Sequence, residues 1–177
     1  MLMTAEEYVA ENSKVPACYN ALGDVGVLFE HTDTGYDIRF YCDISNVFHS
    51  KTVIHCETSE EFLHRFNKIQ QDIDDCFIEL RKIYDSSIAL INSLSNIIDV
   101  DTLDRYINTT TIMEIGYTHF ELGEYNGEIV CFISNCREDI YETAFLIEQE
   151  VVDITNLHKE WNDCVTKVSE KFETLCS

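Results

Sequence analysis

The sequence predicts an α+β fold: two long, antiparallel, coiled-coil-like helices, at about 59–98 and 137–176, with two β-hairpins and short N-terminal and middle helices. In both long segments apolar residues recur in alternating steps of four and three, which is the spacing of a coiled-coil seam. Period-two alternation over 25–42 predicts the first hairpin. One proline, six glycines and 45% hydrophobic residues indicate an ordered chain without long linkers.

The N-terminal segment predicts a short helix. Thr4 followed by Glu7 forms a capping-box pattern, in which each residue satisfies a backbone N–H at the start of the helix. The helix is expected to end near Asn12, ahead of Pro16, because proline cannot continue it.

The next segment predicts a hairpin with a turn at 33–35. One face is apolar, and the other carries polar groups, so one side should lie on a core. A third strand is expected at 52–56. The first face holds Val25, Val27, Phe29, His31, Tyr36, Ile38, Phe40 and Cys42, and the second holds Asp37, Arg39, Tyr41 and Asp43.

A second capping-box pattern, from Thr58 to Glu61, opens the first long helix. Residues 85–87 could break it, because Asp and Ser side chains compete for backbone hydrogen bonds. Its seam holds Phe62, Phe66, Ile69, Ile73, Cys76, Leu80, Ile83, Ser87, Leu90, Leu94 and Ile97.

The second half repeats this order: a short helix at 102–108, strands at 111–122 and 128–134 joined by a turn at 123–127, and the second long helix. An antiparallel pairing of the two seams sets the small Cys76 opposite the large Trp161, which suits close packing. We expect one domain over 1–177, or two lobes (1–58 and 99–136) joined by the helix pair. The second seam holds Ile140, Ala144, Ile147, Val151, Ile154, His158, Trp161, Val165, Val168, Phe172 and Leu175.

The eight cysteines are expected to be free thiols of a cytoplasmic protein, because no signal-peptide pattern precedes them. They show no C-x-x-C spacing, so the sequence predicts no metal site and no cofactor. His55 and Cys56 are adjacent on a predicted strand and should point to opposite faces, which argues against a catalytic pair. Without any catalytic signature, we expect no enzyme, and no apolar run is long enough to span a membrane.

The net charge is the most unusual property of the chain. Acidic residues number 33 and basic residues 12, giving −21 at pH 7. Such a chain repels phosphates, so direct nucleic-acid binding and binding to an anionic membrane are disfavoured. The expected partner is a basic protein surface, such as the groove of a nucleic-acid-binding enzyme like a nuclease.

Acidic residues are concentrated in 106–158, where Arg137 is the single lysine or arginine. A solvated face that keeps the protein soluble would explain them, and so would mimicry of DNA phosphates. The candidate partner-binding residues are Glu114, Glu121, Glu124, Glu128, Glu138, Asp139, Glu142, Glu148, Glu150 and Asp153.

The sequence therefore favours a non-enzymatic, DNA-mimic-like inhibitor that occupies the basic groove of its target. In size and acidic composition the chain is similar to the anti-restriction and anti-CRISPR inhibitors that phages encode, which would place it in the host cytoplasm. Two alternatives stay open: an immunity protein that neutralises a basic toxin nuclease, and a structural coiled-coil module. A homodimer would fit the coiled-coil alternative.

Overall fold

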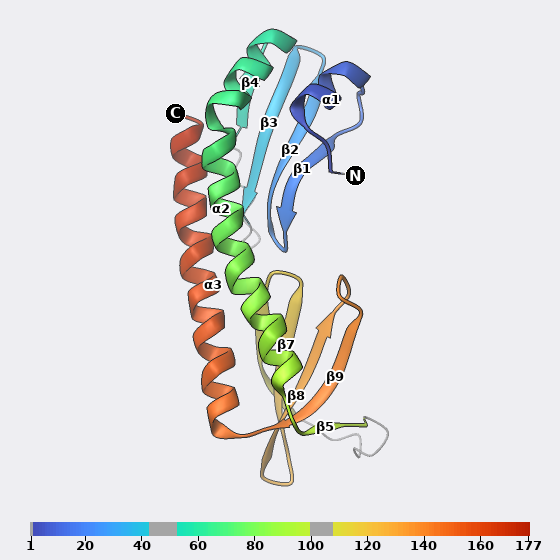
Figure 1. Ribbon diagram of the computed structural model, residues 1–177, viewed down its shortest axis with the longest axis vertical. Coiled ribbons are helices and arrows are strands. Elements are labelled where there is room, and N and C mark those ends of the chain that lie inside the picture. The colour runs from blue at the N-terminus through green and yellow to red at the C-terminus, as the bar shows by residue number, and fades with distance from the viewer. Residues whose placement is uncertain (1, 43–52, 100–107) are drawn as a thin grey trace. The chain divides into compact units, whose positions relative to one another are not determined.

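The computed structural model of the chain describes residues 2–42, 53–99 and 108–177 (Figure 1). Two antiparallel sheets have the strand orders β1-β2-β3-β4 and β5-β9-β8-β7-β6. The chain divides into two compact units, Met1–Arg81 with Asp163–Ser177 (unit 1) and Lys82–Asn162 (unit 2). The elements are α1 (Ala5–Glu11), β1 (Ala17–Leu22), β2 (Val25–Thr32), β3 (Gly35–Cys42), β4 (Val53–Cys56), α2 (Ser59–Ser93), β5 (Ile97–Ile98), β6 (Asn108–Ile115), β7 (Thr118–Tyr125), β8 (Glu128–Asn135), β9 (Ile140–Leu146) and α3 (Glu148–Leu175).

The prediction of two coiled-coil-like helices with two hairpins is wrong, because sheets of four and five strands form the centres of the two units. Seam residues of both helices pack on strands. The ring centroids of Phe62 and Phe66 lie 5.2 and 5.1 Å from that of Phe29 on β2, and the ring of Phe172 lies 4.8 Å from that of Phe40 on β3. An apolar stripe does not reveal whether a helix or a sheet will cover it.

The first sheet confirms the predicted hairpin. Val27 pairs with Phe40 and Phe29 with Ile38, and all four side chains are buried. β4 is the predicted third strand; Asp43 and Thr52 lie outside the described residues. β1 was not predicted, because all but the last of its six residues are only half-buried and show no clear alternation.

In unit 1 the helices begin where the capping-box patterns of the sequence predict. Thr4 and Glu7 form the predicted capping box, and Asn12 ends α1 in the left-handed conformation, with φ of 49°. At the start of α2 the Thr58 hydroxyl accepts from the Glu61 N–H at 3.2 Å. The Glu61 carboxylate accepts from the N–H of Glu57 rather than of Thr58.

Helix α2 runs without a break through residues 85–87. The hydroxyls of Ser86 and Ser87 donate to carbonyl oxygens of the preceding turn, at 2.9 and 2.7 Å, so they do not displace the helical hydrogen bonds. The helix ends at Ser93, short of the predicted 98, because Ile97–Ile98 form β5 and pair with β9.

In unit 2 the predicted boundaries are wrong in two places. The segment 111–122 is not one strand: it turns at Gly116, with φ of 60°, and belongs to both β6 and β7. The helix predicted from 137 begins only at Glu148, because Ile140–Leu146 forms β9 and pairs along its whole length with β8. The middle helix at 102–108 lies outside the described residues except for Asn108, which begins β6.

Candidate functional site

All ten candidate acidic residues belong to unit 2. Seven are exposed, and Glu121, Glu150 and Asp153 are half-buried. Their positions are Glu114 on β6, Glu121 and Glu124 on β7, Glu128 on β8, Glu138 and Asp139 in the β8–β9 turn, Glu142 on β9, and Glu148, Glu150 and Asp153 on α3.

The strand registers sort these acids onto two faces of the five-stranded sheet. Residues directly opposite one another on neighbouring strands share a face of the sheet. One such row runs across β6, β7, β8 and β9 and consists of Ile112, Glu121, Phe132 and Thr143. By alternation Glu114 and Glu128 share this face, called the outer face here. Glu124 and Glu142 take the other face, so the structure does not bring all ten acids together.

The inner face of this sheet is the buried one and meets α2. Met113, Ile115, Phe120 and Ile133 are at most 4% exposed. Tyr84 of α2 reaches the same face, because its hydroxyl accepts a hydrogen bond from Nδ2 of Asn135 on β8 at 2.8 Å. A Cβ atom added to Gly116 would lie 2.7 Å from the Tyr84 ring, so α2 approaches the β6–β7 turn closely.

Asn135 joins α2, β7 and the β8–β9 turn. Its Nδ2 donates to the hydroxyl oxygens of Tyr84 and Thr118, both at 2.8 Å. Its Oδ1 accepts from the backbone N–H groups of Arg137 and Glu138, at 3.0 and 3.1 Å. The Tyr84 hydroxyl then donates to Glu138 at 3.2 Å. All four hydrogen-bonding positions of the Asn135 amide are therefore used, which fixes the turn that carries Glu138.

Basic groups do little to offset the charge of the ten acids. Glu114 lies 3.1 Å from Nδ1 of His119. Among the described residues, none of the ten lies within ion-pair distance of a lysine or arginine. The guanidinium of Arg137 instead lies over the Tyr117 ring, 5.0 Å from its centroid.

Some of these acids also have a local structural role. Glu148 and Glu150 occupy the first turn of α3, where negative charge is favourable beside the helix dipole. The Glu150 carboxylate accepts from the Ile147 N–H at 2.9 Å, and Asp153 accepts from Gln149 at 2.8 Å. The strand and turn acids therefore make the stronger candidates for binding.

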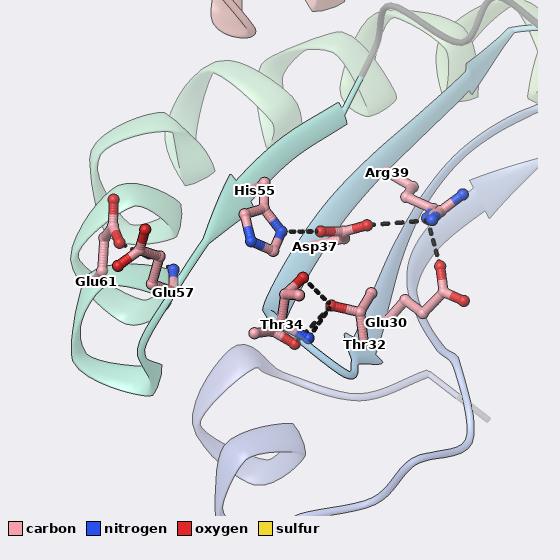
Figure 2. Close-up of polar contacts among 9 residues, drawn as sticks. Glu30, Thr32, Thr34, Asp37, Arg39, His55, Glu57 and Glu61 are labelled. Atoms are coloured by element: carbon pink, nitrogen blue, oxygen red, sulfur yellow. Dashed lines mark hydrogen bonds and ion pairs between the residues drawn. The ribbon is translucent and has the colours of Figure 1, made fainter.

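A second polar cluster lies on the first sheet (Figure 2). The Asp37 side chain is only 8% exposed. Its Oδ1 lies 2.6 Å from Nδ1 of His55, and its Oδ2 lies 3.1 Å from Nη2 of Arg39. Arg39 also pairs with Glu30. Glu30, Asp37 and His55 are directly opposed on β2, β3 and β4, so the cluster is a row of polar side chains across three strands.

This cluster was not predicted, because only the β3–β4 register brings Asp37 to His55. The predicted separation of His55 from Cys56 is confirmed: His55 is exposed and Cys56 is buried. An aspartate on Nδ1 orients an imidazole in the way that a general base requires. The nearby Thr32 and Thr34 hydroxyls bond to one another, and Thr32 donates to the Gly35 carbonyl, so they serve the β2–β3 turn.

The prediction of free thiols is confirmed for all eight cysteines. Burial raises the pKa values of Cys42 and Cys131 to about 12, which keeps both protonated at neutral pH. Within residues 2–42, 53–99 and 108–177, no group of three or more His, Cys, Asp or Glu side chains is arranged to hold a metal ion.

Across the described part of the chain, no helix is both long and apolar enough to cross a membrane. The sequence matches no protein-family model, no curated protein and no solved structure.

Proposed function

We propose that the chain is a non-enzymatic acidic binding protein that inhibits a nucleic-acid-binding enzyme in the cytoplasm, in the manner of anti-restriction or anti-CRISPR inhibitors. One observation carries the proposal. Residues 106–158 hold ten acids against Arg137, and none of the ten is paired with a lysine or arginine among the described residues.

Uncompensated carboxylates favour a basic partner for a simple reason. Like charges held close together repel, and this cost is recovered when a positive surface covers them. The basic surfaces that attract DNA or RNA phosphates would attract these carboxylates too. The long-range field also speeds the encounter with such a partner.

The acids stand on rigid elements, which lowers the entropic cost of binding. Glu121 and Glu128 lie on strands paired along eight residues, and Asn135 fixes the turn beside Glu138. The alternative of a coiled-coil module loses its support, because seam residues such as Phe62 and Phe172 pack on strands.

Capture from a cell lysate tests the proposal. The tagged protein is incubated with lysate at about 50 mM salt, washed at about 500 mM, and the released proteins are identified. A basic nucleic-acid-binding enzyme should be retained at low salt and released at high salt, and the protein should inhibit it. Retention of several unrelated proteins, or of none, contradicts the proposal.

A charge-matched pair of variants shows whether unit 2 is responsible. The first replaces Glu114, Glu121 and Glu128, three acids of the outer face, with lysine. The control replaces Glu11, Glu170 and Glu173, three exposed acids of unit 1, with lysine, and so changes the net charge equally. The first variant should lose capture and inhibition, whereas the control should keep most of both. Equal loss in the two variants would show that net charge alone is responsible.

A further inference from the structure

The outer face of the five-stranded sheet carries large apolar side chains in addition to its acids. Ile112 on β6 is 65% exposed and Tyr141 on β9 is 66% exposed. Ile112 opposes Glu121, and Tyr141 opposes Ser134 of β8, whose other neighbour is His119 of β7. Both apolar side chains therefore stand on the outer face, away from the core that Tyr84 of α2 contacts.

Two half-buried aromatic rings lie on the same face, toward the end of the sheet where β7 turns into β8. Tyr125 on β7 and Phe145 on β9 stand on either side of β8, and their ring centroids are 6.4 Å apart. Strands separated by one intervening strand are about 9.6 Å apart, so these rings lean toward each other over β8. They help to explain why Val130 of β8 is fully buried although it is on the outer face. Phe132, also half-buried, extends the apolar surface beside them.

Acidic residues flank these apolar groups on the same face. Glu121 lies between Ile112 and Phe132 in the registers. Glu114 is a diagonal neighbour of Glu121, at about 7–8 Å between Cα atoms. Glu128 stands beside Tyr125. The face thus combines exposed and half-buried apolar and aromatic side chains with carboxylates that lie between and beside them. Aromatic side chains of this kind are enriched in protein–protein interfaces.

We propose that this outer face docks a basic protein segment in which apolar side chains alternate with arginine or lysine. The inference rests on the proposed function and names the surface that performs it. Tyr141, Ile112 and the rings around Phe132 contact the apolar side chains of the partner. Glu114, Glu121 and Glu128 pair with its cations.

The negative charge of the outer face favours a basic protein segment over single-stranded nucleic acid and over a second copy of the chain. Aromatic side chains on a sheet can stack on the bases of single-stranded nucleic acid, but here Glu121 and its neighbours would repel the phosphates. A second copy of the chain would bring a surface of the same sign, because a two-fold contact sets the same patch against itself and each protomer carries −21. A basic segment is attracted at every one of these acids.

Two peptides of equal charge test the docking surface. One alternates arginine with leucine, and the other alternates arginine with serine. Binding of each labelled peptide to the full chain is measured by fluorescence anisotropy at about 50 and 300 mM salt. The leucine peptide should bind at least about tenfold more tightly and should keep this advantage at the higher salt, because burial of apolar surface is not screened.

Variants then locate the effect. Tyr141→Ser and Ile112→Ser should each remove most of the advantage of the leucine peptide. Ile78→Ser, a matched control at a 52%-exposed position of α2 in unit 1, should keep it. Glu121→Gln should weaken both peptides at low salt. Circular dichroism checks that each variant is folded.

Equal affinity of the two peptides, or an advantage that survives in both Tyr141→Ser and Ile112→Ser, overturns the docking surface. Failure of both peptides to bind overturns it as well. The lysate capture does not depend on these peptides, so it decides the proposed function separately.

Discussion

Replacement of Asn135 with alanine should destabilise unit 2 more than any surface change. The substitution removes four hydrogen bonds and leaves the hydroxyl of Thr118, which is fully buried, without its Asn135 partner. The Tyr84 hydroxyl keeps its bond to Glu138, and the two turn N–H groups can reach water. Each of these three bonds contributes about 0.5–1 kcal/mol and the buried one about 1–2 kcal/mol, so the loss is about 2.5–5 kcal/mol.

Urea unfolding measures this loss. The single tryptophan, Trp161, is 6% exposed and belongs to unit 2, so its fluorescence reports on the relevant part of the chain. If the free energy of unfolding changes by about 2 kcal/mol per M urea, the unfolding midpoint should fall by about 1.2–2.5 M. Asn156→Ala, at an exposed position of α3, is the matched control and should shift the midpoint by less than about 0.3 M.

A midpoint shift for Asn135→Ala that equals the shift of this control would contradict a stabilising role for the Asn135 amide. It would mean that water replaces all four partners at no cost, and that Asn135 does not fix the β8–β9 turn. A second variant, Thr118→Val, removes the buried hydroxyl and keeps the shape of the side chain. It should cost about 1 kcal/mol.

Three further predictions concern the turns and the thiols. Gly35→Ala should lower the free energy of unfolding in urea by at least about 3 kcal/mol, because φ is 148° and the new Cβ would lie 2.1 Å from a β4 carbonyl oxygen. Gly127→Ala should lower it by only about 1 kcal/mol, because φ is 83° but no atom lies within 4 Å of the new Cβ. Burial raises the pKa of the Cys131 thiol to about 12 in the folded chain, so the unfolded chain loses this proton at a lower pH. The free energy of unfolding should therefore fall as the pH rises above about 9. In Cys131→Ala this fall should be smaller. At pH 7.5 a thiol reagent should modify the exposed Cys136 well before Cys131, as peptide mapping by mass spectrometry would show; equal rates would contradict the buried position of Cys131.

Local patterns predicted the first sheet better than the second. Period-two alternation placed Val27 and Phe40 correctly, because one face of this hairpin is buried and the other is not. In β9 the same reasoning failed, since Ile140, Ala144 and Ile147 also fit the helical four-three spacing. Pairing of β9 with β8, a contact between distant residues, decided between the two.

For the candidate site, the sequence predicted which acidic residues could bind a partner, but not on which face of the sheet each of them lies. The grouping of Glu121 with Ile112 and Phe132 follows from strand registers, and those depend on the turn at Gly116. A glycine inside a predicted strand was the available signal for that turn. The pairing of Asp37 with His55 had no local signal, because it joins two strands across a register that the sequence does not specify.

The binding of a basic partner by the carboxylates of the outer face is tested most directly by the salt dependence of binding to the enzyme captured from lysate. Its association constant is measured from about 50 to 500 mM salt for the wild-type chain and for a variant with Glu114, Glu121 and Glu128 replaced by glutamine. Binding through these carboxylates should give the wild type an association constant that decreases steeply with salt, and the variant a weaker binding that depends less on salt. An affinity that does not change with salt, or that is the same in both proteins, would contradict the claim that these carboxylates bind a basic partner.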